Sequence, residues 1–183
     1  MEFVLDNGSV RIALSTAGGS FTSITANGRE YLWQGDPAVW SGQAPICFPI
    51  CGGLRDGRAM TMGGREVKLA RHGFARKQEW KLEEQGDNMV ALSLSSADHA
   101  ELLEQYPYPF KIVARYTIDA AKVAVSYEGP MRAPRTCRSL WVATLALSAR
   151  LTRASPMTTT SSILISARPP SSVPVSYTHL TLP

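Results

Sequence analysis

His72 lies in the most informative short string of the chain, Arg71-His72-Gly73-Phe74-Ala75-Arg76. A histidine that follows a strand-like segment and precedes a glycine can present its imidazole at the tip of a loop. Imidazole exchanges protons near neutral pH, so it suits general acid–base chemistry better than any other side chain. On spacing alone, a surface histidine between two arginines is the commoner explanation, and the chemical role stays a hypothesis at this point.

A second segment, residues 45–58 (PICFPICGGLRDGR), interrupts the surrounding pattern. Two prolines four residues apart frame apolar side chains, and the glycine pair that follows permits unusual backbone angles. Two interpretations are equally open. The segment is either a buried loop that crosses a sheet or a loop that places Arg55 in a pocket.

Metal and phosphate sites find little support in the sequence. Cys47 and Cys51 are four residues apart, but no nearby histidine or second cysteine pair completes a ligand set, so neither a metal site nor a cofactor is predicted. The apolar neighbours of both cysteines predict buried thiols. Gly63-Gly64-Arg65 lacks the spacing of a phosphate-binding loop.

Other residues that could do chemistry have simpler explanations. His99 lies in an acid-rich, helix-like segment and is predicted to be solvated. Trp33, Trp40 and Trp80 could stack on a sugar face, but core packing is predicted for each of them.

The elements that must position these residues are mostly strands. Only residues 97–105 have helical composition. Many short strands at roughly ten-residue spacing predict an all-β, antiparallel sandwich or barrel rather than an α/β fold. The predicted strands cover residues 3–5, 10–14, 21–26, 30–33, 59–62, 65–69, 78–83, 89–95, 110–118 and 122–127.

The net charge of +4 conceals two different parts of the 183-residue chain. Residues 129–183 carry six arginines and no acidic residue, whereas the first 128 residues carry all 15 acids. The scattered arginines, without lysines or an interleaved aromatic pattern, argue against a nucleic-acid partner. No run of about 18 apolar residues predicts a membrane span. Three cysteines without a paired motif, and an N-terminus unlike a signal peptide, predict a cytoplasmic protein.

Taken in order, several strings are similar to the aldose 1-epimerase (galactose mutarotase-like) family, in its bacterial branch with the string HGFAR. The resemblance covers residues 1–128, the N-terminal part of a longer family domain. It implies a large antiparallel β-sandwich, the galactose mutarotase-like supersandwich, which would be incomplete in this chain. The strings are residues 30–34 (EYLWQ), 45–50 (PICFPI), 54–57 (LRDG), 72–76 (HGFAR) with Trp80, 108–110 (YPF) and 123–127 (VAVSY).

The resemblance implies interconversion of the α and β anomers of a hexose by acid–base ring opening, with no metal or cofactor. His72 matches the family's first histidine, which holds the sugar near its ring oxygen, and is the catalytic candidate. Arg55, Arg71 and Arg76 are the substrate-binding candidates. The family's arginine after the loop glycine falls at Gly53 here, so whether Arg55 replaces it stays open. For Arg76, an ion pair at the rim of the site is favoured.

In the family, a second histidine in a Gly-His-Pro-type motif follows the strand that matches residues 123–127, and a carboxylate base lies near the C-terminus. Neither is legible here. The family-like string Met-Pro-Phe-Ser-Val-Gly-Gly-His-Pro-Gly can be encoded by a DNA sequence that, when translated one base later, gives the amino acids of residues 137–146. Residues 129–183 are therefore predicted to be frame-shifted and disordered, the alternative being a genuine Ser/Thr/Pro-rich tail.

The expected function is that of an aldose 1-epimerase-like protein that is inactive as this truncated chain. One alternative is a hexose-6-phosphate 1-epimerase, with Arg55, Arg71 and Arg76 serving the phosphate. Another is a non-catalytic carbohydrate-binding β-sandwich. The expected partner is a small sugar in each case, and no oligomeric state is predicted.

Overall fold

The computed structural model describes residues 1–61, 63–129, 142–143, 162–167 and 180–181. Its first sheet contains four antiparallel strands in the order β1-β2-β3-β4. The Asn7 side chain shapes the turn between the first two strands, because its Oδ1 accepts the backbone N–H of Ser9 at 3.1 Å and of Val10 at 3.0 Å. The strands are β1 (Glu2–Asp6), β2 (Val10–Ser15), β3 (Ser20–Ala26) and β4 (Arg29–Glu30).

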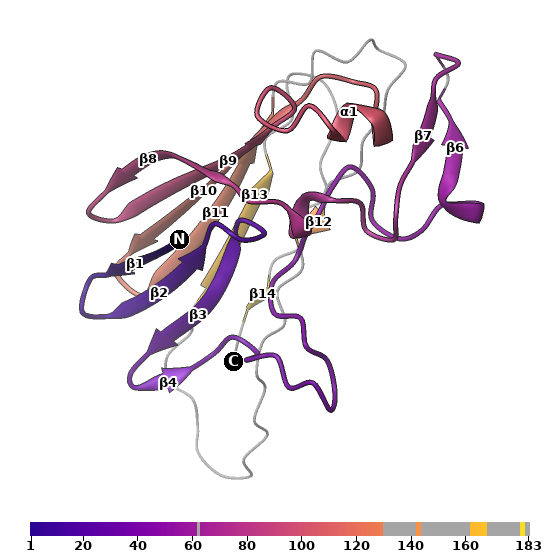
Figure 1. Ribbon diagram of the computed structural model, residues 1–183. Helices are drawn as coiled ribbons and strands as arrows, with labels where there is room; N and C mark the ends of the chain where they lie inside the picture. Colours follow the sequence, from indigo (N-terminus) through magenta and orange to yellow (C-terminus); the bar gives the residue numbers. More distant parts are fainter. Residues whose placement is uncertain (62, 130–141, 144–161, 168–179, 182–183) are drawn as a thin grey trace.

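The second sheet has the order β14-β13-β11-β10-β9-β8 and faces the first (Figure 1). Strands β8 to β11 pair antiparallel, whereas β13 pairs parallel to β11. Strand β8 lies at the edge, all its residues are exposed, and its pairing shifts register at a bulge between Leu82 and Glu84. The strands are β8 (Lys81–Gly86), β9 (Met89–Ser95), β10 (Lys111–Asp119), β11 (Lys122–Glu128), β13 (Ser162–Ala167) and β14 (Leu180–Thr181).

The core lies between the two sheets and follows from alternating apolar residues. In β10 every second side chain is buried, because successive side chains of a strand point to opposite faces. Tyr116 of β10 reaches across the core, where its ring meets Phe21 edge-on at a centroid distance of 4.9 Å. The Tyr116 hydroxyl also donates a hydrogen bond to the Gly19 carbonyl. One side chain therefore joins both layers by packing and by a hydrogen bond.

Shorter elements occupy the ends of the sandwich. Strands β6 and β7 form a hairpin that projects from the body (Figure 1), and β5 pairs with β12. Among the described residues, no helix has the length and apolar character needed to span a bilayer. These elements are β5 (Ile46–Cys47), η1 (Arg55–Gly57), β6 (Arg58–Met60), β7 (Glu66–Lys68), η2 (Ala75–Lys77), α1 (Leu102–Gln105) and β12 (Val142–Ala143).

The predicted all-β, antiparallel fold class is confirmed. Several local expectations differ from the structure. The strand predicted over 78–83 is displaced to Lys81–Gly86, and the one predicted over 65–69 covers only Glu66–Lys68. The helix occupies only Leu102–Gln105 of the predicted 97–105, and the strand predicted over 30–33 ends at Glu30. The Tyr31 N–H still donates to the Ile24 carbonyl at 2.8 Å, but the Glu30 carboxylate accepts the backbone N–H of Ile24 at 2.9 Å and of Leu32 at 2.8 Å in place of backbone acceptors.

The predicted frame-shifted, disordered segment 129–183 lies mostly outside the described residues. Of this segment, the structure describes residue 129 and strands β12, β13 and β14. The predicted boundary at residue 128 coincides with the end of β11.

Candidate functional site at His72

His72 lies at the tip of a tight turn between β7 and η2. Its φ is +68° and that of Gly73 is +70°, so two consecutive residues adopt the left-handed conformation. Histidine is one of the few non-glycine residues that is enriched in this region. The turn is closed by a hydrogen bond of 2.9 Å from the Gly73 N–H to the Ala70 carbonyl. The local sequence therefore presents a half-buried imidazole at the bend.

Two hydrogen bonds between His72 and Gly52 fix the orientation of the imidazole. The His72 backbone N–H donates to the Gly52 carbonyl at 2.7 Å, and the Gly52 N–H donates to His72 Nδ1 at 3.0 Å. Because Nδ1 accepts a hydrogen bond, the neutral ring carries its proton on Nε2. The loop 45–58 thus selects the tautomer of the histidine from the HGFAR string.

Close backbone contact locks the two segments together next to this pair. The Phe48 carbonyl accepts the Phe74 N–H at 2.9 Å, and Phe48 forms a β-bridge with Gly73. A methyl group at Gly73 would lie 2.8 Å from the Pro49 nitrogen and closer still to the Phe48 carbonyl. Only glycine fits this position, which explains the Gly of the HGFAR string.

Buried aromatic rings pack against the loop 45–58 and the HGFAR turn on their core side. Phe48 meets Phe74 at a centroid distance of 5.8 Å, Phe110 at 5.1 Å and Tyr106 at 5.9 Å. Phe48, Phe74, Tyr106 and Phe110 are all buried. Three strings that are far apart in the sequence therefore share one aromatic cluster, which holds the His72 turn rigidly on the sandwich.

Trp80 joins this cluster to the first sheet. Its indole Nε1 donates to the Ala75 carbonyl at 3.0 Å, and its backbone N–H donates to the Thr16 carbonyl at 2.8 Å. Trp80 is 1% exposed, so its predicted core role is confirmed. The same prediction is wrong for Trp40, which is 41% exposed because it lies in the loop between β4 and β5. Trp33 is half-buried and donates to the Trp40 carbonyl at 2.7 Å.

The three arginines occupy different places. Arg55 begins η1 and is exposed, and Arg71 is exposed beside His72. Arg76 is half-buried, and its Nη2 donates to the Arg71 carbonyl at 3.0 Å. Its Nε is buried with no hydrogen-bond partner in the described part of the chain. No ion pair among the described residues includes Arg76, so the ion pair favoured for it at the rim stays a prediction.

The two cysteines lie beside His72, although the sequence offered no histidine near them. The Cys51 Sγ is 4.0 Å from His72 Nδ1, and the ligand atoms of Cys47, Cys51 and His72 all lie within 4.8 Å of one another. The predicted burial is confirmed for Cys47 and wrong for Cys51, which is exposed. Burial and the neighbouring Cys51 raise the pKa of the Cys47 thiol, against the opposing charge of Arg76.

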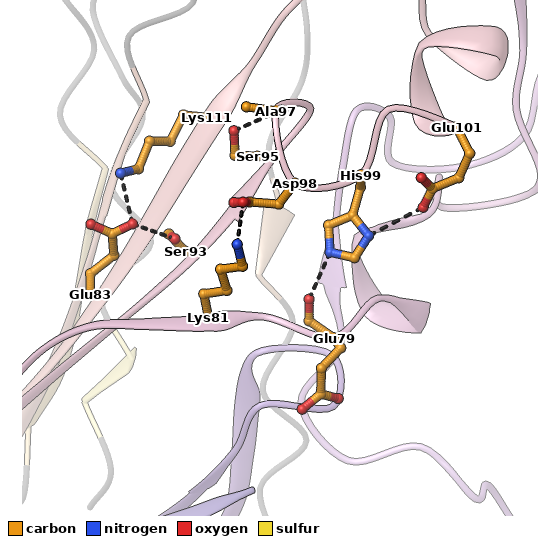
Figure 2. A network of polar contacts seen from close by, with 10 residues as sticks. All are labelled: Glu79, Lys81, Glu83, Ser93, Ser95, Ala97, Asp98, His99, Glu101 and Lys111. Carbon is orange, nitrogen blue, oxygen red and sulfur yellow. Dashed lines mark hydrogen bonds and ion pairs between the residues drawn. The ribbon is translucent and has the colours of Figure 1, made fainter.

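His99 is not the solvated residue that was predicted, because its side chain is only 20% exposed. Figure 2 shows its ring between Glu79 and Glu101. Nε2 lies 3.0 Å from the Glu79 carbonyl oxygen, and Nδ1 lies 3.2 Å from Glu101 Oε1. The Nε2 contact joins the segment after β9 to Glu79, just before β8, and the Nδ1 contact lies within that segment, which indicates a structural role.

The chemistry available at His72 is donation from Nε2. With Nδ1 held by Gly52, the neutral ring offers Nε2–H to an acceptor such as an ether or hydroxyl oxygen. Within the described residues, no carboxylate forms a hydrogen bond or ion pair with His72. The described part of the site therefore offers a donor at His72, with Arg71 beside it, and no carboxylate bonded to the ring as a general base.

Comparison with known proteins places these features in a family. The family model described as aldose 1-epimerase matches residues 1–137. The chain is 39% identical over 133 residues to the plasmid and chromosomal LacX proteins of Lactococcus lactis subsp. lactis. That match covers 70% of this chain and 44% of each LacX protein, so the chain spans less than half the length of these curated relatives.

Solved structures give the same result for the fold. A galactose mutarotase related enzyme from Lactobacillus acidophilus is 26% identical, with a TM-score of 0.61 over 66% of this chain and 40% of that one. A galactose mutarotase-like protein from Lactobacillus casei is 23% identical, with a TM-score of 0.66 over 70% of this chain and 44% of that one. The sandwich described here is thus the N-terminal part of a galactose mutarotase-like fold.

Proposed function

Because the chain belongs to the aldose 1-epimerase family, we propose that its His72 site binds a hexose and is part of a protein that interconverts the sugar's α and β anomers. The LacX relatives and the galactose mutarotase related enzyme of L. acidophilus support a mutarotase-like function. The sugar would lie against the His72 turn, with the neighbouring arginines available to its hydroxyl groups.

The hydrogen bond from Gly52 to His72 Nδ1 carries this proposal. It leaves Nε2–H free to donate to the ring oxygen of a pyranose. A carboxylate base removes the proton of the anomeric hydroxyl while the ring oxygen is protonated, and the C1–O5 bond breaks. Rotation about C1–C2 and closure on the other carbonyl face give the other anomer. A well-placed acid or base typically contributes about 10²–10⁴ in rate.

We further propose that this 183-residue chain binds sugar without turning it over. This proposal is supported by the absence, among the described residues, of any carboxylate that forms a hydrogen bond or ion pair with His72. Polar donors alone can hold a sugar, whereas mutarotation needs a proton acceptor as well.

The test uses the full chain with α-D-glucose and α-D-galactose. Saturation-transfer NMR should detect binding, and polarimetry should detect no anomerisation above the buffer rate. His72→Asn should abolish binding, whereas the control His99→Asn, outside the site, should retain it. Turnover by the unaltered chain would refute the inactivity. Equal binding by the His72→Asn variant would refute the site.

A hexose 6-phosphate is the second candidate ligand, and the arginines favour it. Arg55 and Arg71 are exposed without an acidic partner among the described residues, and the Arg76 Nε lacks an acceptor. Arginine binds phosphate through paired charge-assisted hydrogen bonds. Glucose 6-phosphate should then bind about tenfold more tightly than glucose, and Arg71→Ala should remove the difference. Equal affinities for the two sugars would exclude this candidate.

An assay on a longer chain distinguishes the third candidate function, a non-catalytic sugar-binding sandwich, from an epimerase. If a frame-corrected chain of full family length binds glucose but does not accelerate anomerisation, the binding function is favoured over the epimerase. Acceleration by that longer chain would exclude it.

A further inference from the structure

We propose that Cys47, Cys51 and His72 form a binding site for a thiophilic cation of the Zn²⁺ class. The two thiols come from the loop 45–58 and the imidazole comes from the HGFAR turn. Their ligand atoms lie within 4.8 Å of one another. This inference goes beyond the proposed function and does not depend on it.

The donor set matches the chemistry of zinc. Two thiolate sulfurs and one imidazole nitrogen are among the preferred ligands of this ion, and three protein ligands with an open fourth position are a known arrangement. Two thiolates balance the charge of a divalent cation. Hard ions such as Mg²⁺ and Ca²⁺ prefer oxygen ligands, which this cluster does not provide.

The distances require only a small contraction. With a Zn–S bond of about 2.3 Å and a Zn–N bond of about 2.0 Å, a tetrahedral ion holds its ligand atoms about 3.5–3.8 Å apart. The Cys51 Sγ is already 4.0 Å from His72 Nδ1. The glycines that follow Cys51 leave room for the adjustment, because no atom lies within 4 Å of a Cβ position at Gly52 or Gly53.

The orientation of the imidazole also fits. His72 Nδ1 already presents its lone pair to the Gly52 N–H, so a cation would replace this donor without turning the ring. Nε2 would keep its proton, and the cation and a sugar would use different nitrogens of one ring. Cys51 is exposed and Cys47 is buried, which gives an ion an entry side and an anchored side.

The test titrates the full chain, reduced and metal-free, with Co²⁺ and then Zn²⁺. Co²⁺ should produce a thiolate-to-metal charge-transfer band that Zn²⁺ bleaches, and native mass spectrometry should count one ion per chain. Cys51→Ser alters an exposed side chain and should weaken binding at least about 100-fold, since loss of even an outer-shell partner costs about 10–100-fold. His72→Gln should weaken it similarly.

Cys137→Ser and His99→Gln are the matched controls, because they remove a thiol and an imidazole that the proposed ligand set does not include. Both should bind the ion as the unaltered chain does, and circular dichroism should show the same fold for all variants. The proposal is overturned if no stoichiometric ion binds, if Cys51→Ser binds as well as the unaltered chain, or if binding disappears with Cys137→Ser. Sugar turnover is not part of the readout.

Discussion

Gly73 lies directly against the backbone of Phe48, and its left-handed conformation allows the HGFAR turn to lock onto the loop 45–58. This contact holds His72 over Gly52 and brings the cysteines to the imidazole. The arrangement at the site therefore depends on one residue that has no side chain.

Gly73→Ala is expected to destabilise the chain by about 3 kcal/mol or more, because it adds overlap with Phe48 to the strain of a positive φ. Gly64→Ala is the matched control. Gly64 has a φ of +72°, but no atom lies within 4 Å of its Cβ position. The Gly64→Ala variant should therefore lose only about 1–2 kcal/mol of its free energy of unfolding. Urea unfolding followed by circular dichroism measures both, and equal losses would show that the contact with Phe48 is unimportant.

Tyr116→Phe should cost about 1–3 kcal/mol, because the Gly19 carbonyl in the core would lose its donor. Burial raises the pKa of the Tyr116 phenol well above its usual value, with a further contribution from Tyr127. The unfolded chain therefore releases this proton first, and stability should fall as the pH rises above about 10.

The Tyr116→Phe variant should lose part of that alkaline decline. Urea midpoints measured from neutral to alkaline pH test this. Parallel declines for both proteins would show that Tyr116 does not contribute.

Glu83→Gln should affect stability only where the carboxylate is charged. Hydrogen bonds from Lys111 and Ser93 lower the pKa of Glu83, so the folded chain favours the ionised form (Figure 2). That stability is present above the unfolded pKa and is lost as the pH falls. Because Glu83 is 36% exposed, the loss at neutral pH should be at most about 1 kcal/mol and should vanish in acid.

Glu66→Gln is the control for this experiment. Glu66 pairs with Lys68 at 3.4 Å on the exposed hairpin, and its replacement should change the urea midpoint less at neutral pH. A Glu83→Gln variant that is destabilised equally at acidic and neutral pH would contradict the electrostatic explanation.

The source DNA should contain a reading-frame change near Glu128–Pro130. The composition changes there, and residues 137–146 fit a family-like string read one base later. Sequencing across codons 120–150 is expected to reveal the slip and to restore a Gly-His-Pro-type motif. An uninterrupted frame would favour the genuine Ser/Thr/Pro-rich tail.

Alternation allowed most strands to be predicted because it reflects the geometry of a half-buried strand. Residues 89–95 and 122–127 were placed within one residue of β9 and β11 for this reason. The helix was overestimated because composition says little about turns that side chains close. The Ser95 hydroxyl accepts the Ala97 N–H at 3.0 Å at the start of that segment.

The cluster at His72 could not be predicted from local spacing. His72 follows Cys51 by 21 residues and Cys47 by 25 (72 − 47), and the three meet only because the loop and the turn share hydrogen bonds. Cys51 was expected to be buried from its apolar neighbours, but it immediately precedes Gly52, whose φ of +97° turns the chain. A glycine pair beside a cysteine was the signal that could have indicated the exposed position.

Strand β8 has a consequence for self-association. Its free edge could pair with a strand from another molecule, but that pairing would desolvate the charged side chains of Lys81, Glu83 and Glu84. The bulge after Leu82 also interrupts the regular backbone spacing that a docking strand needs. Edge-to-edge aggregation of two molecules through β8 is therefore disfavoured.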